Sequence, residues 1–274
     1  MKILAFDTAN NSASVAISED QIILAYIEEL RSSMQAETIV PMIEEALKIA
    51  KLSYHDLDYL AVTNGPGSFT GIRIGLSVAK GILLSTDIIG TTISNFEFSW
   101  WGASRQVKNY DKIFIFLNAY RGQLYSQVFD QNEQASIPSL INYDQAVELL
   151  NTENAAINVC AGSGVEMIYD KIRDIKNLTI LPRFTRVKAL HICKYIADKI
   201  DLLRNSTSAG NLCVDPALES SRTFEYAAVQ GEVSPANSLA EANFARGLIR
   251  KHNFSNSIEP LYIRPADAKI RLLT

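Results

Sequence analysis

The chain has 274 residues, of which 47% are hydrophobic and 20% are charged, and this composition is typical of a globular protein with room for one large domain or two lobes. The net charge of -4 argues against autonomous, non-specific binding of nucleic acid, because that activity needs clustered cations. No window approaches the about 20 apolar residues of a membrane-spanning helix. The opening MKILAFDT lacks the layout of a signal peptide, so we expect a cytoplasmic protein.

Three short apolar runs separated by polar turns open the chain and predict an antiparallel meander. The next segment places apolar side chains at helical spacing and charged ones opposite, which predicts an amphipathic helix. A buried-type strand, a glycine-rich turn and a second helix follow. The predicted strands are 2–6, 14–18, 21–28, 59–63 and 88–93, the first helix is 35–51, and an apolar segment lies at 96–103.

The second half of the chain begins in the same way. Residues 112–117 and 123–129 predict a hairpin around the AYRG turn at 119–122. A short helix at 143–150, a strand at 155–161 and an amphipathic helix at 187–203 follow. Two halves that each start with hairpins and continue in alternating helix and strand predict a two-lobed α/β protein.

The predicted lobe boundaries follow from this repetition. We place the first lobe at 1–105 and the second at 106–204 plus 258–274. Residues 205–257 are rich in Ser, Asn, Ala and Gly, with few strand-like runs and a short helical pattern at 239–251. A connection of this length is unusual in a compact domain, so we interpret it as a surface insertion with the composition of a disordered segment.

The stretch NGPGSFTGIRIGLSVAKGI, residues 64–82, joins a predicted strand to a predicted helix. Glycine before a helix suggests a phosphate loop, but both the P-loop and the Rossmann patterns require a glycine where Thr70 stands. Ser68 or Thr70 can cap the helix, and its first N–H groups and dipole favour an anion. A capped strand-to-helix turn without a ligand is the alternative.

Glycines also recur inside the predicted helix. Gly75 and Gly81 together cost about 2 kcal/mol relative to alanine. Small residues repeat every four positions, and the helix is apolar on nearly every side, which indicates that it is covered on several sides. The sequence therefore predicts close helix contact, with the core of the lobe or with a partner.

Asp7 and Thr8 end the first predicted strand. A carboxylate at this place can order Mg²⁺ or water beside a phosphate, and a hydrogen-bonding role in the turn is the alternative. An actin-like kinase needs a second acid in the other lobe, where this chain has Asn118, which cannot act as a general base. The candidate contacts for a nucleotide or an anion are Asp7, Thr8, Gly65, Gly67, Ser68 and Thr70.

The remaining reactive residues do not form a recognisable site. The three histidines are scattered, and His191 and Cys193 point to different sides of a helix, so we expect no metal site and no Cys–His nucleophile. The three cysteines fit reduced structural thiols. Tyr120 and Arg121 at the hairpin tip combine a stacking ring with a cation, and the sequence does not separate partner binding from a turn-shaping role.

The motifs taken together are more specific than any one of them. ILAFDTANNSASVAIS, VPMIEEAL, NGPGSFTGIRIGLSVAKGI, NAYRGQLY and EPLYIR, in this order, resemble the bacterial TsaB (YeaZ) family. The resemblance covers residues 1 to about 200 and returns in the tail, and residues 205–257 have no counterpart. It implies the actin/Hsp70/sugar-kinase (RNase H-like) fold, with mixed sheets flanked by helices.

The resemblance also implies a function. The chain would be a non-catalytic subunit that acts with its catalytic paralogue TsaD and the ATPase TsaE in threonylcarbamoyl transfer to the adenosine beside the anticodon of ANN-decoding tRNAs. It would meet tRNA only through the complex and could form a homodimer in isolation. It would bind no cofactor tightly, with ATP and Mg expected only in the assembled complex. No catalytic residue is expected, and Met34 or Gln35 stands where relatives often have a histidine.

The same resemblance places the partner interface on two helices of the first lobe. The expected interface residues are Ala36, Ile39, Val40, Ile43, Leu47, Gly71, Gly75, Leu76, Val78, Ala79 and Ile82. Two alternatives stay open. One is an independent actin-like ATPase or small-molecule kinase that uses Asp7 and the loop 65–70. The other is a glycoprotease-like hydrolase, for which the sequence offers neither a metal-ligand cluster nor a nucleophile–base pair.

Overall fold

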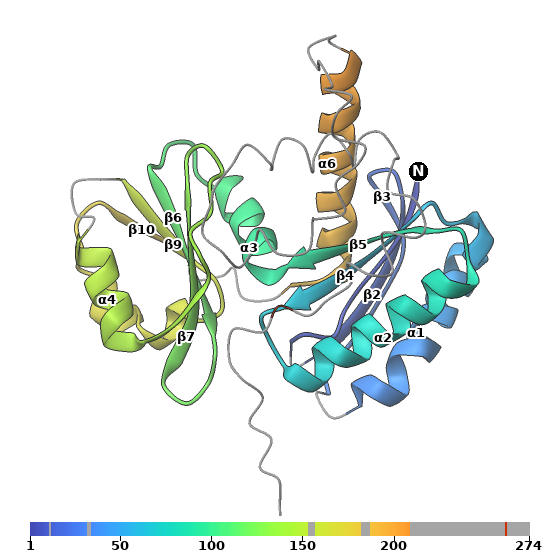
Figure 1. Cartoon of the computed structure of the whole chain (residues 1–274), viewed down its shortest axis with the longest axis horizontal. Helices are drawn as coiled ribbons and strands as arrows, with labels where there is room; N and C mark the ends of the chain where they lie inside the picture. Colours follow the sequence, from blue (N-terminus) through green and yellow to red (C-terminus); the bar gives the residue numbers. More distant parts are fainter. Residues whose placement is uncertain (11, 32–33, 153–156, 182–186, 209–260, 262–274) are drawn as a thin grey trace, which may run out of the picture. The chain divides into compact units, whose positions relative to one another are not determined.

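The computed structural model of the protein describes residues 1–10, 12–31, 34–152, 157–181, 187–208 and 261. These residues divide into two compact units, each with its own five-stranded sheet (Figure 1). Among the described residues, the first unit holds 1–64, 74–93 and 187–208, and the second holds 65–73, 94–152, 157–181 and 261.

The sheet of the first unit has the strand order β3-β2-β1-β4-β5. Its strands are β1 (Lys2–Asp7), β2 (Ala13–Glu19), β3 (Ile22–Glu29), β4 (Tyr59–Gly65) and β5 (Ile89–Ser94). The pairs β1–β2 and β2–β3 are antiparallel, which confirms the predicted meander, and β1 pairs with β4 in parallel. Every residue of β1 after Lys2 is buried, as expected for a central strand covered on both faces.

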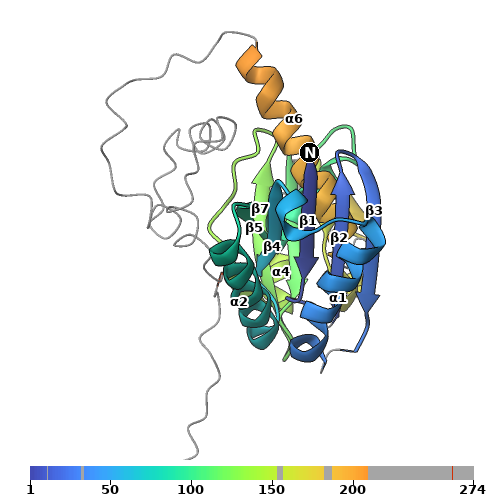
Figure 2. The ribbon, with the colours of Figure 1, turned by 90° about the vertical axis from the view of Figure 1, so that its right-hand side faces the viewer.

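Helices cover both faces of this sheet. The helices of the first unit are α1 (Gln35–Ala50), the part of α2 (Phe69–Ser85) from Ile74 on, and α6 (Ala189–Ser208), with a short 3-10 helix η1 (Tyr54–Asp56). Figures 1 and 2 show α1 and α2 on one face of the sheet and α6 on the opposite face. The predicted helices at 35–51 and 187–203 are confirmed, and α6 continues to Ser208.

Helix α6 belongs to the first unit, whereas the sequence-based boundary put this helix in the second lobe. Its Cys193 thiol lies 3.8 Å from the backbone oxygens of Ile3 in β1 and Ala16 in β2. The backbone N–H of Ala189 donates to Ser14 at 3.0 Å, and Lys188 pairs with Glu28 of β3 at 3.1 Å. An amphipathic pattern shows that a helix packs on a sheet, but it does not show which sheet.

The sheet of the second unit has the order β10-β9-β6-β7-β8. Its strands are β6 (Lys112–Asn118), β7 (Gln123–Asp130), β8 (Ser139–Asn142), β9 (Asn158–Ala161) and β10 (Leu178–Leu181), and its helices are α3 (Asn95–Ser104), α4 (Tyr143–Thr152), η2 (Val165–Met167) and α5 (Tyr169–Ile172). Helix α3 packs on this sheet through a core that includes Phe96, Ala103, Ile113 and Val159. Residues 94–105, which the sequence-based boundary put in the first lobe, therefore belong to the second unit, as do residues 65–73.

Several further predictions can be compared with the structure. The β6–β7 hairpin is confirmed, and β8 and β10 were not predicted. Cys160 and Cys193 are buried free thiols, and burial raises the pKa of each to about 12. Of the predicted insertion, only 205–208 are described, as the end of α6, and the predicted helix at 239–251 lies outside the described residues. None of the described helices is both long and apolar enough to cross a membrane.

Candidate functional site

Asp7 lies at the end of β1 and is 0% exposed. Its Oδ1 accepts hydrogen bonds from the Thr63 hydroxyl of β4 and from the backbone N–H of Ala9, the latter at 3.2 Å. Its Oδ2 accepts from the Asn10 amide at 2.9 Å. Both oxygens of the carboxylate are therefore held by the loop that follows β1 and by the neighbouring strand, which supports the turn-forming interpretation of Asp7.

The pKa of Asp7 is raised from its usual value because burial disfavours the charged form. The hydrogen bonds from Thr63, Asn10 and Ala9 stabilise the carboxylate and lower the pKa, but they offset the effect of burial only in part. Thr8, the next residue, is 1% exposed. Asp7 and Thr8 therefore show no exposed surface toward a nucleotide, and their contact with one stays a prediction.

The turn before α2 carries the other candidate anion contacts. The Ser68 hydroxyl accepts a hydrogen bond from the backbone N–H of Gly71 at 3.2 Å, so Ser68 caps the helix. Of the two predicted capping residues, Ser68 and Thr70, the structure thus confirms Ser68. Thr70 is exposed in the first helical turn. Gly65 is buried with a φ of 106°, a conformation that L-residues rarely adopt, so this position requires glycine for its backbone alone.

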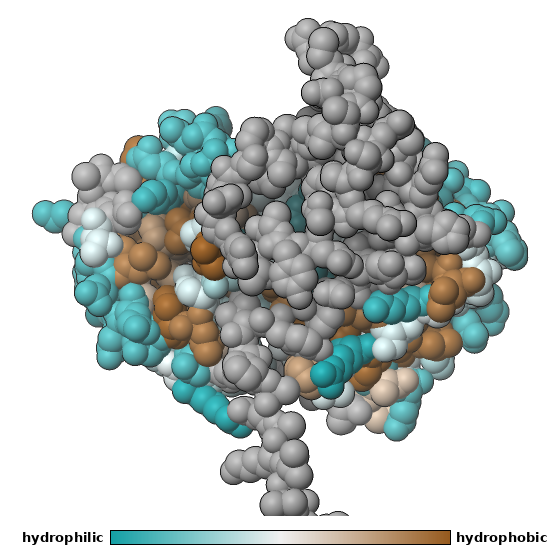
Figure 3. All heavy atoms as spheres, viewed as in Figure 1, coloured by the Kyte–Doolittle hydropathy of each residue, from teal (hydrophilic) through white to brown (hydrophobic). Residues whose placement is uncertain are grey.

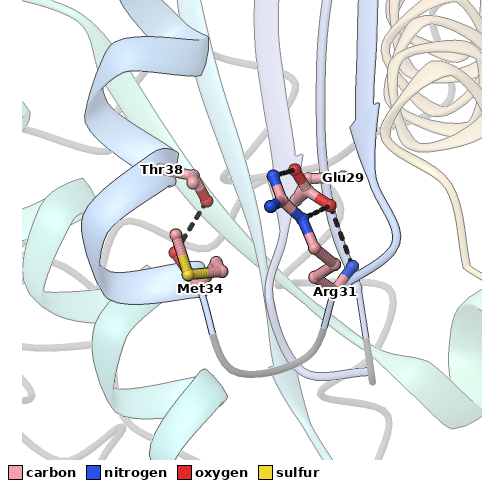
Figure 4. Close-up of polar contacts among 4 residues, drawn as sticks. All are labelled: Glu29, Arg31, Met34 and Thr38. Atoms are coloured by element: carbon pink, nitrogen blue, oxygen red, sulfur yellow. Dashed lines mark hydrogen bonds and ion pairs between the residues drawn. The ribbon is translucent and has the colours of Figure 1, made fainter.

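Polar contacts fix the start of α1 and the end of β3 before it. Gln35 is 5% exposed, and its side-chain amide donates to the backbone oxygens of Asn10 and Ser12 at 2.7 and 3.2 Å, which ties the helix to the β1–β2 loop. Figure 4 shows the Arg31 guanidinium against the Glu29 carboxylate, with bonds of 2.9 and 2.6 Å, and the Thr38 hydroxyl on the Met34 carbonyl oxygen. Gln35 thus has a structural role at the place where a histidine was expected in relatives.

The predicted interface residues of α1 fall into two groups. Ile39, Ile43 and Leu47 are at most 6% exposed and face the sheet, so they form the core of the first unit in the isolated chain. Ala36 is exposed and Val40 is 41% exposed. Only these two of the five predicted α1 residues are accessible to a partner, because amphipathic spacing marks the buried face of a helix whatever covers it.

Helix α2 divides in the same way. Gly71, Gly75, Leu76 and Ala79 are buried, whereas Val78 and Ile82 are partly exposed. A Cβ at Gly75 would overlap the Thr8 hydroxyl, so this glycine serves the contact between α2 and β1. In contrast, Gly81 is exposed, and a Cβ there would meet nothing within 4 Å. Figure 3 shows hydrophobic residues between hydrophilic ones over α2.

Four residues of the predicted interface are thus left exposed or partly exposed, and exposed Gly81 lies among them on α2. The accessible apolar face of the two helices is defined here as these residues together: Ala36, Val40, Val78, Gly81 and Ile82. Sequence reasoning assigned Gly81 to close contact but did not include it in the interface set. It also missed Thr63 and Asn10, the partners of Asp7. Strands β1 and β4 pair in parallel with Phe6 beside Val62, and this register brings the next residue of β4, Thr63, to Asp7. The spacing of residues in the sequence does not predict which strands pair or in which register.

The second unit provides no acid at the place where a kinase would need one. The Asn118 side chain accepts from the backbone N–H of Tyr120 at 2.8 Å, and the Asn118 backbone N–H donates to Ser163 at 3.1 Å. Among the residues that the structure describes, no three His, Cys, Asp or Glu side chains gather closely enough to hold a metal ion.

Comparison with known proteins gives a consistent answer. The profile of the family described as "TsaD: tRNA N6-adenosine threonylcarbamoyltransferase" matches residues 29–271. The tRNA threonylcarbamoyladenosine biosynthesis proteins TsaB of Escherichia coli and of Buchnera aphidicola from Schizaphis graminum are 32% and 37% identical over 133 and 123 residues. The chain belongs to the TsaB (YeaZ) branch of the TsaD family. These matches cover 48% and 45% of this chain, and they span only 57% and 58% of the two TsaB relatives.

Solved structures show the same fold. YeaZ from Pseudomonas aeruginosa superposes with a TM-score of 0.58 at 18% identity, over 95% of this TsaB-family chain and 99% of the other. A second Pseudomonas aeruginosa structure, described as an uncharacterized protein with similarity to peptidase YEAZ, gives 0.61 at 17% identity over 96% and 99%. The expected α/β architecture of the actin/Hsp70/sugar-kinase type, with two mixed sheets flanked by helices, is confirmed.

The hydrogen bonds of Asp7 in this TsaB-family chain lead to a first prediction. We expect Asp7→Asn to fold, because its side-chain oxygen can accept from Ala9 and Thr63 while the Asn10 amide turns over. Because the pKa of Asp7 is raised in the folded state, the folded chain binds the Asp7 proton more tightly than the unfolded chain does. The resulting stabilisation is complete at a pH below the pKa of Asp7 in the unfolded chain, and it is lost as the pH rises through the pKa of Asp7 in the folded chain. The stability of Asp7→Asn relative to the native chain should therefore increase with pH above about 4, as measured by denaturant unfolding.

Asp7→Ala is the matched comparison. It leaves the Thr63 hydroxyl and the Ala9 N–H buried without an acceptor, at a cost of about 1–3 kcal/mol for each unpaired group. We expect this variant to be less stable at every pH. A stability difference between Asp7→Asn and the native chain that does not change with pH would contradict the raised pKa of Asp7.

Proposed function

We propose that the chain is a non-catalytic subunit that acts with a TsaD-like catalytic paralogue and a TsaE-like ATPase in threonylcarbamoyl transfer to the adenosine beside the anticodon of ANN-decoding tRNAs. The names of its TsaB relatives support this role. In this proposal the chain works in the cytoplasm, reaches tRNA only through the complex, and binds no cofactor tightly by itself, with ATP and Mg entering at the assembled complex.

The observation that carries the proposal is the glycine at position 81. Gly81 is exposed in the interior of α2, where glycine costs about 1 kcal/mol relative to alanine. Nothing in the described part of this chain requires the missing side chain, because a Cβ there would meet open space. The partly exposed Val78 and Ile82 lie on the same side of the helix. Close approach by a partner's helix would explain why this position lacks a side chain.

The hydrogen bonds of Asp7 and Asn118 are a second physical reason to favour a subunit over an independent ATPase. Both oxygens of Asp7 are engaged within its own unit, and the matching place of the second unit holds Asn118, whose oxygen accepts from Tyr120. Neither group is arranged as a base for an attacking water or hydroxyl.

Reconstitution tests the function directly. We expect purified TsaD- and TsaE-like proteins of the same organism to modify an unmodified ANN-decoding tRNA when this chain is present and to lose at least about 90% of that activity when it is left out. The product is measured as threonylcarbamoyladenosine in digested tRNA. Full activity without this chain would overturn the proposal. ATP turnover by the chain alone, retained in Val78→Glu, would favour the ATPase.

A further inference from the structure

Helix α1 begins without a conventional cap. Met34 occupies the N-cap position, and its thioether offers no oxygen to the first N–H groups of the helix. The Thr38 hydroxyl of the first turn donates to the Met34 carbonyl oxygen at 2.8 Å (Figure 4). The ends of helices fray readily when little holds them. The first turn of α1 therefore depends on a contact outside the helix.

Gln35, the first helical residue, supplies this contact. It is 5% exposed, and its amide nitrogen donates to the backbone oxygens of Asn10 and Ser12 at 2.7 and 3.2 Å. Both oxygens belong to the loop between β1 and β2. Leucine and methionine have helix propensities close to that of glutamine, and their burial carries no loss of polar hydration. A buried glutamine is thus explained by the loop that its amide holds, and not by helix stability.

Asp7 holds the same loop from its other end. The Asn10 amide donates to Asp7 Oδ2 at 2.9 Å, and the Ala9 N–H donates to Asp7 Oδ1 at 3.2 Å. The Thr63 hydroxyl of β4 donates to Oδ1 as well. A chain of hydrogen bonds thus runs from β4 through Asp7 and Asn10 to Gln35, and all of its members belong to the first unit. Buried hydrogen-bonded networks fix the arrangement of the elements that they join.

The first turns of α1 carry its share of the accessible apolar face. Ala36 follows Gln35 directly, and Val40 lies about one turn further on, 40° or so around the helix from Ala36. Ala36 is exposed and Val40 is 41% exposed, whereas Ile39 and Ile43 are 0% exposed. The buried isoleucines hold the helix on the sheet, and the Gln35 amide fixes the end from which the accessible residues project.

We propose that Gln35 is a positioning residue for partner binding: it holds the first turn of α1 on the β1–β2 loop, and so sets where Ala36 and Val40 meet the helix of a TsaD-like partner. This inference rests on the proposed function, which brings such a partner to the accessible apolar face. The core of a protein interface is packed as closely as a protein interior, so a shifted turn loses its contacts there.

The test is a double-mutant cycle on the affinity of the chain for a TsaD-like partner of the same organism. Val40→Ala removes two methyl groups from a packed contact and should weaken binding about tenfold in the native background. Gln35→Met keeps the length of the side chain without the amide, and it should also weaken binding about tenfold. In the Gln35→Met background Val40 no longer meets the partner closely, so Val40→Ala should then cost only about twofold.

Ile82→Ala is the matched probe on the other helix of the same face. Ile82 is partly exposed on α2, which the Gln35 amide does not hold. Ile82→Ala should therefore weaken binding by the same factor in the native and the Gln35→Met backgrounds. A merely structural role of Gln35 would change both effects or neither, so a coupling that is selective for Val40 is the mark of positioning. All affinities are measured by calorimetric titration.

Ile196→Val separates positioning from a general loss of stability. Ile196 is 1% exposed on α6, which covers the opposite face of the sheet from α1 (Figure 2). Its truncation should lower the Tm and leave partner affinity unchanged. The N–H groups of Glu37 and Thr38 donate to the Met34 oxygen at 3.1 and 3.0 Å. Their hydrogen exchange should be about tenfold faster in Gln35→Met and unchanged in Ile196→Val.

Asn10→Ala provides a second variant of the same chain of hydrogen bonds should Gln35→Met not fold. Asn10 is half-buried, and its side chain ties the loop to Asp7, so Gln35 keeps its two acceptors on a loop that is held less firmly. In this background the Val40→Ala effect should fall to about fivefold, and the Ile82→Ala effect should again be unchanged.

The outcomes separate this inference from the proposed function. Equal Val40→Ala effects in the native and variant backgrounds, with a stable native complex, overturn the positioning role of Gln35 alone. Equal reduction of the Val40→Ala and Ile82→Ala effects shows a general loss of the interface and overturns it too. If the native chain does not bind the TsaD-like partner, the proposed function fails and this inference fails with it.

Discussion

Val78→Glu is expected to abolish binding to a TsaD-like partner while leaving the chain folded. Val78 is only partly exposed on α2, and it lies about 60° around the helix from Gly81 and about 40° from Ile82. A carboxylate there would reach water in the isolated chain, so its stability should change by no more than about 0.5 kcal/mol. In a packed interface the same charge would be buried without a partner, at a cost of several kcal/mol, roughly a 100-fold or greater loss of affinity.

Ile49→Glu is the matched control for this prediction. Ile49 lies on α1, is 51% exposed, and points about 180° away from Val40, an α1 residue of the accessible apolar face. It adds the same charge to the first unit without entering the accessible apolar face, so affinity should change little. The measurements are calorimetric titration with the TsaD-like partner and thermal unfolding of each variant. Equal weakening by both substitutions would show a general charge effect, and unchanged affinity in Val78→Glu would place the partner elsewhere.

The fold could be predicted from the sequence wherever an element is long and periodic. The β1–β2–β3 meander, α1 and the β6–β7 hairpin each carry a regular hydrophobic pattern between turn residues. Strands β8 and β10 have four residues each and are only partly buried, which is too short a pattern to recognise. The packing of α6 on β1 and β2 depends on contacts between residues about 180 positions apart, which local pattern cannot supply.

The candidate site was harder to predict than the fold, because one pattern has two physical causes. Ile39 and Val40 are adjacent apolar residues of α1, yet the first is 0% exposed and the second 41% exposed. Apolar residues at helical spacing are required both by a core and by a partner surface. The sequence therefore predicted that both segments are helices, which the structure confirms, but it could not say which of their residues remain accessible, and the partner interface on them stays a prediction. The glycines of α2 present the same ambiguity.

Gly75→Ala and Gly81→Ala are expected to change stability in opposite directions. At Gly81 the methyl group meets open space, and alanine should stabilise the chain by about 0.5–1 kcal/mol through helix propensity. At Gly75 the methyl group overlaps the hydroxyl of Thr8, the residue that follows β1, which is 1% exposed. Overpacking at such a site costs about 1–3 kcal/mol, which outweighs the gain in propensity. The measurement is denaturant unfolding of both variants. If the slope of the unfolding free energy against denaturant concentration is unchanged, a shift of the midpoint is a change in stability.

A double-mutant cycle with Thr8→Ala tests the cause of the loss. Without the Thr8 hydroxyl, the nearest atom to a Cβ at Gly75 is Val62 Cγ2 at 3.4 Å, an ordinary contact. Gly75→Ala should therefore cost little in the Thr8→Ala background, with a coupling free energy of about 1 kcal/mol or more. No coupling would mean that Thr8 does not set the spacing between α2 and β1. In that case the partner-facing role that the sequence suggested for Gly75 would have to be considered again, because the cost of glycine there would lack an explanation within the chain.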